Sequence, residues 1–278
     1  MSRTLAVTNQ KGGVAKTTTV VSLGAAFAEQ GLRVLLVDLD AQSCLTFSLG
    51  VEPDDVEVGT YDVLVGTVSV ADALVPVPDA PPAGTLDLLP GSIDLSAAEA
   101  ALLPRDAREF VLRDALAGVR ERYDVVLLDC SPSLGVLTLN ALAAADEVLV
   151  PLQCEMLSHR GVGQLLDTVS DVQRLLNPAL VLRGALPTMF DSRSVHSRAV
   201  LEDVATRYGL PVLRPAIPRS VRFAEAPAAG RSILSTARTS KGAQAYRDVA
   251  AELMRSWRIR PGRRRRTATA TATATKPS

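Results

Sequence analysis

The organisation of this chain follows from residues 11–18, which read Lys11-Gly12-Gly13-Val14-Ala15-Lys16-Thr17-Thr18. Residues 4–8, just before them, form a short apolar and β-prone run, and residues 19–30 have the periodicity of a helix with one apolar face. A strand, a glycine loop and a helix in this order suit phosphate binding, because backbone N–H groups at a helix N-terminus point at an anion. The competing interpretation is a Gly-Gly turn before an ordinary amphipathic helix.

The side chains of the loop favour phosphate binding. Gly12 and Gly13 let the backbone approach phosphates without a Cβ in the way. Lys16 can reach the β- and γ-phosphates, and the Thr17 hydroxyl can ligate Mg²⁺. The chain has four lysines against 26 arginines, and two of those four lysines flank this loop. A compact ammonium on a flexible stem suits a phosphate, so these lysines support the phosphate-loop interpretation.

The strict pattern G-x-x-x-x-G-K-[ST] is not met, because Gln10 and Ala15 stand where its two glycines would be. The residues instead resemble the deviant Walker A motif of the ParA/MinD family of P-loop ATPases, in which Gly or another small residue takes the place of Ala15. The resemblance implies that Lys11 reaches the nucleotide of a partner subunit in an ATP-sandwich dimer. The nucleotide-binding residues that it implies in this loop are Lys11, Gly12, Gly13, Val14, Ala15, Lys16, Thr17 and Thr18.

Two further apolar runs end in acidic residues. Residues 33–38 read as a strand buried on both faces of a parallel sheet and lead into Asp38 and Asp40, and residues 123–129 end in Asp129. Carboxylates at the carboxyl ends of such strands face the ligand crevice. Beside a phosphate loop they would repel a nucleotide unless they served a metal ion or a water molecule. The alternative for Asp38 is that it only caps the end of its strand. Asp129 taken alone is a weak signal, because many buried strands end in Asp.

Both runs add to the family resemblance. Residues 38–42 are similar to the family's D-x-D-P-Q motif, with Ala41 in place of Pro, and residues 123–129 resemble a Walker B strand. The resemblance implies that Asp40 positions or activates the attacking water and, with Lys11 and Lys16, makes up the catalytic set. It places Thr17, Asp38 and Asp129 around Mg²⁺.

Later motifs resemble chromosomal-type ParA proteins, often called Soj. Residues 188–193 are similar to their T-M-F-D-x-R run, and residues 217–227 to their I-P-R-x-V-R-x-x-E-A-P run, so the resemblance covers about Leu5 to Trp257. It implies a nucleotide contact at Pro218 and DNA contacts at Arg193 and Arg222, with Arg219 as a third. The alternative is that these arginines pair with nearby carboxylates such as Asp191 or Glu225.

The alternation of strands and helices predicts a single α/β domain with a doubly wound, mostly parallel sheet and helices on both faces. Residues 1–258 would form this ATPase domain, and residues 259–278 a disordered, basic, Thr/Ala-rich tail. Further predicted helices span 107–122, 158–176 and 195–208. Further predicted strands span 86–89, 148–151 and 180–186, and another begins at 212. Short helices are expected over 44–74 and a proline-rich loop over 75–84.

The formal net charge is zero but unevenly spread, since the chain up to Glu252 carries −8 and the remainder +8. A nucleic-acid site on the body must therefore be a local patch. For the basic tail, a solvated segment and a non-specific DNA contact both stay open. No apolar run approaches the roughly 18 residues of a membrane span. The three cysteines lack C-x-x-C spacing and suit a reducing cytoplasm, the expected location together with the nucleoid.

The predicted function is that of a ParA-type partitioning ATPase. ATP and Mg²⁺ would close a homodimer that binds double-stranded DNA non-specifically, and a ParB-like centromere-binding protein would stimulate its slow hydrolysis of ATP. The alternative is a membrane-positioning ATPase of the MinD type. That type carries an apolar C-terminal helix face, which is missing after Ile259, so no stable membrane association is expected. The nitrogenase iron protein type and the bacterial tyrosine kinases are disfavoured by the cysteine spacing and by the lack of a terminal tyrosine cluster.

Overall fold

A computed structural model describes residues 2–154 and 158–262, and these contain one seven-stranded sheet with the order β3-β4-β2-β5-β1-β6-β7. Neighbouring strands run parallel except β3 and β4, which pair antiparallel at the edge. The predicted fold class, a doubly wound and mostly parallel sheet, is confirmed. The strands are β1 (Arg3–Val7), β2 (Arg33–Leu39), β3 (Val75–Pro76), β4 (Thr85–Leu89), β5 (Val125–Cys130), β6 (Glu147–Gln153) and β7 (Val181–Thr188).

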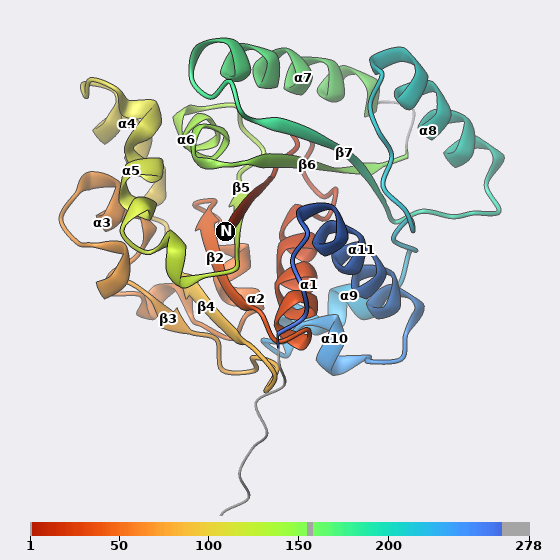
Figure 1. The fold of residues 1–278 in the computed structure, drawn as a ribbon, viewed down its shortest axis with the longest axis horizontal. Coiled ribbons are helices and arrows are strands. Elements are labelled where there is room, and N and C mark those ends of the chain that lie inside the picture. The colour runs from red at the N-terminus through yellow and green to blue at the C-terminus, as the bar shows by residue number, and fades with distance from the viewer. Residues whose placement is uncertain (1, 155–157, 263–278) are drawn as a thin grey trace, which may run out of the picture.

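Helices cover both faces of this sheet, and successive side chains of each strand enter opposite cores. In β1, Leu5 and Val7 pack into one core while Ala6 packs into the other. The first face carries α1 (Lys16–Glu29), α2 (Cys44–Ser48), α9 (Arg222–Ala228), α10 (Ile233–Thr236) and α11 (Lys241–Trp257), several of which lie together in Figure 1. The second face carries α3 (Thr60–Val65), α4 (Leu95–Leu102), α5 (Val111–Ala117), α6 (Val136–Ala144) and α7 (Ser158–Leu175).

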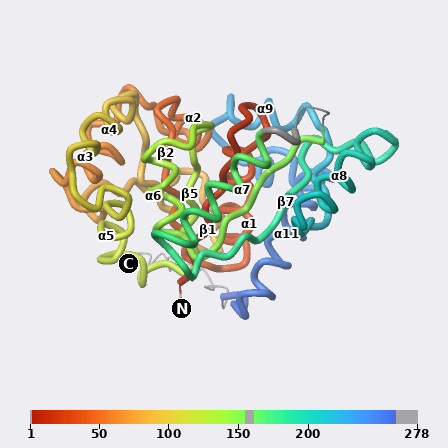
Figure 2. Tube along the Cα trace, turned by 90° about the horizontal axis from the view of Figure 1, so that it is seen from above, coloured from red at the N-terminus to blue at the C-terminus, as the bar shows by residue number. Residues whose placement is uncertain are grey.

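The two ends of the molecule are formed by different elements. Figures 1 and 2 show α3, α4 and α5 at one end and α8 (Val195–Tyr208) at the other. Helix α8 packs beside β7 through Val200 and Val204, which join a small third core with Ala185. Short 3-10 turns, η1 (Pro53–Asp55), η2 (Val70–Asp72), η3 (Arg108–Phe110) and η4 (Arg120–Arg122), fill the connections.

Some predicted elements differ from the observed ones. A single helix over 107–122 is wrong, because η3, α5 and η4 divide that segment and Gly118, a poor helix former, follows the last turn of α5. The strand expected from residue 212 is a single bridge between Ala185 and Val212. Helix α6 was not predicted, because it is buried almost all round and therefore lacks a polar face that would give the helical period.

The topology brings the carboxyl ends of β1, β2 and β5 together. Asp38 of β2 and Asp129 of β5 are register partners, and Val7 of β1 also pairs with Asp129. The glycine loop leaves β1 at this edge and enters α1. The three sequence motifs therefore converge at one place in the fold.

The opposite edge holds the last described residues. Ile259 packs against the first core, and the Gly262 N–H donates to the Gln30 carbonyl at 2.8 Å. A Cβ on Gly262 would overlap the Gly31 carbonyl oxygen, so the two backbones cross in close contact. Residues 263–278 of the predicted tail lie outside the described residues. Within the described part of the chain, none of the helices has the length and apolar character of a membrane span.

Candidate nucleotide-binding site

The loop between β1 and α1 is fixed by side chains from the neighbouring strands. The Asn9 amide donates to the Pro151 carbonyl at 2.8 Å, and its oxygen accepts the Lys11 N–H at 3.0 Å. From β7, the Thr188 hydroxyl donates to the Val14 carbonyl at 3.0 Å. The first and third of these bonds tie the loop to β6 and β7, and the second closes a turn within the loop.

Two residues of the loop have left-handed backbone conformations. Gly13 has a φ of 73°, which glycine adopts without strain. Ala15, directly before α1, has a φ of 69° and a ψ of 36°. An alanine is strained in this region because its Cβ crowds the following carbonyl oxygen. This explains why glycine is the usual residue at that position of the motif and why Ala15 departs from it at an energetic cost.

Lys16 is the buried cation of the site. Its side chain is 7% exposed, and its ammonium lies 3.4 Å from the Lys11 carbonyl oxygen. Burial lowers the pKa of Lys16, while the charge of Asp129 acts in the opposite direction. Such an ammonium, with few neighbours to solvate it, gains much from an approaching phosphate.

A cavity of about 720 Å³ opens beside Lys16, a size suited to a small ligand such as a nucleotide. Nine of the predicted residues line it: Gly12, Gly13, Ala15, Lys16, Thr17, Thr18, Asp40, Pro218 and Arg219, the last predicted as a DNA contact. The predicted residues Lys11, Val14, Asp38 and Asp129 are not on its wall. Val14, Asp38 and Asp129 are buried.

Asp38 is a fully buried carboxylate held by the following helix. Its Oδ2 accepts the backbone N–H of Thr46 at 2.9 Å and the Thr46 hydroxyl at 2.7 Å. Its Oδ1 accepts the Asp40 N–H at 3.2 Å. Burial raises the pKa of Asp38 to about 6, although these hydrogen bonds act to lower it.

Asp129 is a buried carboxylate with little to offset the cost of its burial. Neither of its carboxylate oxygens has a hydrogen-bond partner of good geometry among the described residues. Burial, and then the charge of Asp38, raises the pKa of Asp129 well above its ordinary value of 3.8, and the nearby Thr17 hydroxyl and Lys16 ammonium only partly offset this. Hard oxygen ligands beside a phosphate pocket are what Mg²⁺ requires, and it binds through waters and one or two carboxylates. The orphaned oxygens of Asp129, with the Thr17 hydroxyl beside them, fit such an ion.

Asp40 is arranged differently from the other two carboxylates. It is half-buried on the cavity wall, and its Oδ1 accepts the Gln42 N–H at 3.0 Å. Its other oxygen is available to a water molecule in the cavity. Asp40 therefore lines the cavity, and its role toward an attacking water stays a prediction.

Several residues of the site could not have been identified from the local sequence. Phe47, Met189, Phe223 and Tyr246 come from distant segments and form the apolar part of the cavity wall. Asn9, Thr46 and Thr188 are polar residues in otherwise unremarkable surroundings. Only the fold shows that they hold the loop and Asp38.

The predicted DNA-contacting arginines, Arg193, Arg219 and Arg222, are all exposed. The Phe190 N–H donates to the Ile217 carbonyl at 2.9 Å, which holds the segments bearing Arg193 and Arg219 side by side. The Arg193 side chain is 92% exposed and lies 3.4 Å from Asp191. Arg222 is 2.8 Å from Glu225, so the pairs considered as the alternative are both present. Exposed ion pairs contribute little, and these arginines stay accessible to another anion.

A parallel sheet whose first strand leads through a glycine loop and a buried lysine into a helix defines a P-loop nucleotide-binding protein. Comparison with known proteins agrees with this class. Residues 2–182 match the family model described as an AAA domain. The chain is 45% identical to the sporulation initiation inhibitor protein Soj of Bacillus subtilis, covering 91% of this chain and 98% of Soj. It is 44% identical to the chromosome partitioning protein ParA of Caulobacter vibrioides, covering 91% and 94%.

A solved structure is also closely similar. The crystal structure named cobyrinic acid a,c-diamide synthase, from Mycobacterium smegmatis with bound ADP and magnesium, is 55% identical. It superposes with a TM-score of 0.83 over 95% of this chain and 99% of that one. The chain belongs to the ParA/MinD family of P-loop ATPases, and among its chromosomal ParA and Soj members it has relatives of about 45% identity.

Proposed function

We propose that this protein is a partitioning ATPase of the ParA type, which binds ATP with Mg²⁺ and hydrolyses it slowly. The observation that carries the proposal is the buried carboxylate of Asp129, which has no hydrogen bond of good geometry among the described residues and interacts with the charges of Asp38 and Lys16. An apoprotein gains nothing from such a group, whereas a Mg²⁺–phosphate complex would satisfy it. The relatives named above, one of them a chromosome partitioning ParA, supply the biological setting.

The proposed chemistry assigns one task to each polar group. Lys16 and the N–H groups of residues 12–18 hold the phosphates, and Thr17 with Asp129 and Asp38 holds the metal ion. Bound Mg²⁺ would neutralise charge on the β- and γ-phosphates. Asp40 orients the water that attacks the γ-phosphate. Each of these tasks is assigned to a side chain at the observed convergence of β1, β2 and β5.

The proposed switch is dimerisation. Two ATP-bound subunits would close face to face, each contributing Lys11 to the other's nucleotide, and the paired surfaces of Arg193, Arg219 and Arg222 would bind duplex DNA of any sequence. A ParB-like centromere-binding protein would then stimulate hydrolysis and release the dimer. Through this cycle the protein would associate with the nucleoid and move a chromosome or plasmid.

The experiment combines nucleotide titration with DNA gel shifts. Lys16→Ala should lose ATP binding, because the phosphates lose their main charge partner, while Lys241→Ala at the exposed start of α11 serves as the matched control. Asp40→Ala should bind ATP and DNA but turn over about 10²–10⁴-fold more slowly, the usual contribution of a general base or water-positioning group. Unchanged nucleotide affinity in Lys16→Ala would contradict the phosphate-loop assignment.

The name of the Mycobacterium smegmatis structure gives a second candidate, because that chain is 55% identical to this one. A cobyrinic acid a,c-diamide synthase would form two amides on cobyrinic acid. Incubation with ATP, cobyrinic acid and either ammonium or glutamine, followed by mass spectrometry, distinguishes the candidates. Formation of the diamide, together with an ATPase rate that does not change when DNA is added, would contradict the partitioning proposal.

A further inference from the structure

Helix α9 forms part of the wall of the nucleotide cavity beside Lys16 and also carries Arg222. Phe223, Ala224 and Pro227 line that cavity from α9. Arg222 directly precedes Phe223, and successive side chains of a helix point about 100° apart. The Arg222 side chain is 60% exposed. The wall of the nucleotide cavity and a predicted DNA contact therefore meet in the first turn of α9.

The first turn of α9 is anchored by Phe223. Arg222, Ala224 and Glu225 are exposed, whereas the Phe223 ring is partly buried and packs against the first core. The rings of Phe223 and Tyr246 meet edge to face, with centroids 5.8 Å apart and planes at 86°. A helical turn with few buried contacts opens easily, so the packing of this one ring decides how firmly the turn is held.

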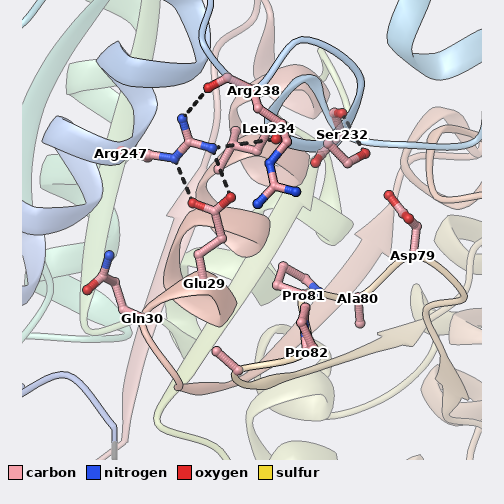
Figure 3. Close-up of a pocket in the computed structure, with 12 residues that line it drawn as sticks. Glu29, Gln30, Asp79, Ala80, Pro81, Pro82, Ser232, Leu234, Arg238 and Arg247 are labelled. Carbon is pink, nitrogen blue, oxygen red and sulfur yellow. Dashed lines mark hydrogen bonds and ion pairs between the residues drawn. The ribbon is translucent and has the colours of Figure 1, made fainter. Parts of the chain in front are cut away.

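The surface on which the ring rests is firmly held. The hydroxyls of Tyr246, in α11, and Thr19, in the first turn of α1, share a hydrogen bond at 3.0 Å. At the other end of α1, Arg247 of α11 donates to both carboxylate oxygens of Glu29 at 2.6 and 2.9 Å, as Figure 3 shows. Helix α11 is therefore bonded to both ends of α1, and the Phe223 ring packs against this fixed pair of helices.

Gly242 provides the room that the ring occupies. A Cβ at Gly242, the second residue of α11, would lie 2.6 Å from Cζ of Phe223 and 2.9 Å from its Cε2. Real Cβ atoms do not come this close to a carbon atom, so a larger residue at position 242 must displace the ring. Such a residue acts on Phe223 from behind, without touching Arg222.

The other end of α9 is fixed by the backbone. Gly230, just after α9, has a φ of 62°, and a Cβ there would lie 2.7 Å from the Cα of Gly50, just after α2. Beside the helix, a gap of about 20 Å³ is lined in part by Thr18, Ser48 and Phe223, so α9 is incompletely packed there. The end of α9 is thus held against α2, while its first turn depends on Phe223.

We propose that Phe223 is a positioning residue that couples nucleotide binding to Arg222. A bound nucleotide packs against the Phe223 ring and keeps the first turn of α9 closed, which holds Arg222 where it meets a DNA phosphate. In the empty cavity this turn opens more often, and Arg222 is less ordered. The inference rests on the proposed function, because it needs a nucleotide in the cavity and a DNA contact at Arg222.

The first experiment measures amide hydrogen exchange of residues 222–228 in the full chain, with and without saturating ADP and Mg²⁺. ADP is chosen because it lacks the γ-phosphate that the proposed dimer requires, so a partner subunit cannot cause the protection. Exchange should slow about tenfold in the wild type and in the control Gly118→Ala, where a Cβ meets open space. Gly242→Ala and Phe223→Ala should lose most of this protection. Thermal melts check that the variants fold, and titration with a fluorescent analogue checks that they bind ADP.

The outcomes separate the inference from the proposed function. Bound ADP without slower exchange in the wild type overturns the inference alone, as does protection in both Gly242→Ala and Phe223→Ala that equals the protection in Gly118→Ala. A wild type that does not bind ADP refutes the proposed function and the inference with it.

The second experiment measures duplex DNA affinity with ATP. Gly242→Ala should weaken binding about tenfold, and its combination with Arg222→Ala should bind no more weakly than Arg222→Ala alone, because both changes remove the same contact. Losses that simply add would show that the ring affects DNA binding by a route other than Arg222, and would contradict the coupling.

Discussion

At the scale of single residues, Ala15 is the clearest departure from an ideal loop. It holds a left-handed conformation at φ 69°, which strains alanine by roughly 1–2 kcal/mol and leaves glycine unstrained. Ala15→Gly should therefore stabilise the protein by about 0.5–1 kcal/mol, after allowance for the greater freedom of glycine in the unfolded chain. Urea unfolding measures the change.

The control substitution should change the free energy of unfolding in the opposite direction. Ala100 is an exposed residue within α4, so Ala100→Gly should destabilise the protein by about 1 kcal/mol. If Ala15→Gly also destabilises the protein, the left-handed conformation at residue 15 is not the one that dominates in solution.

The buried carboxylates predict an unusual pH dependence. The pKa of Asp38 is raised from 3.8 to about 6 and that of Asp129 is raised well above 3.8, so folding disfavours their charged forms. The stability that they contribute is complete below pH 3.8 and is lost as the pH rises through about 6. Without Mg²⁺, the wild type should therefore gain stability from these two groups between pH 7 and pH 5.

Asp129→Asn tests this account at a single site. The amide removes the buried charge, so at pH 7.5 without metal the variant should melt at least about 2 °C higher than the wild type. Its stabilisation by ATP and Mg²⁺ should be much reduced. Asp55→Asn, at an exposed position of η1, should change neither quantity. A lower melting temperature for Asp129→Asn would show that the charged carboxylate is already compensated in the apoprotein.

At the scale of elements, the glycine loop can be tested as a contact surface. A Cβ on Gly12 would have no atom within 4 Å in the single subunit, and its φ is not in the left-handed region. Gly12→Val should therefore fold and bind ATP, yet fail to dimerise, because the branched side chain would occupy the space of a partner subunit. Light scattering with ATP measures the dimer.

The matched control is Gly118→Val. A Cβ at Gly118 also has no atom within 4 Å, but this residue directly follows α5 and is not part of the glycine loop. It should dimerise normally. A full dimer peak from Gly12→Val would contradict the proposed sandwich arrangement.

The elements also show how far the sequence could be interpreted. The continuous apolar run of residues 33–38 predicts a strand buried on both faces of a parallel sheet, and residues 4–8 and 123–129 are predicted as strands; β1, β2 and β5 confirm them. The convergence of Lys16, Asp38, Asp40 and Asp129 follows from that prediction, since parallel strands share a carboxyl edge. The partner of Asp38, Thr46, could not be predicted, because it depends on how α2 folds back over β2. The aromatic cavity wall likewise depends on the packing of α9 and α11.

At the scale of the whole molecule, the two candidate DNA-binding elements differ in nucleotide dependence. A surface made from Arg193 and Arg222 of two subunits exists only in the ATP dimer, whereas a basic segment binds DNA with or without ATP. Arg193→Ala with Arg222→Ala should abolish ATP-dependent DNA binding. Each lost phosphate contact should also reduce the salt slope of log K by about 0.9. Removal of residues 263–278 should only weaken binding, and it spares the Gly262 contact with Gln30.

The control pair is Arg122→Ala with Arg174→Ala, two exposed arginines elsewhere on the body. It removes the same charge and should leave DNA binding intact. If the Arg193 and Arg222 variant binds normally with ATP, and the truncated chain does not bind, the basic segment is the DNA-binding element.

The close crossing of Gly31 and Gly262 bears on how this protein can be labelled for microscopy. The crossing fixes the chain at the far end of α1, on the side of the sheet opposite the glycine loop. A fluorescent protein fused directly after Gly262, in place of residues 263–278, would therefore be attached at the edge of the sheet opposite the nucleotide cavity.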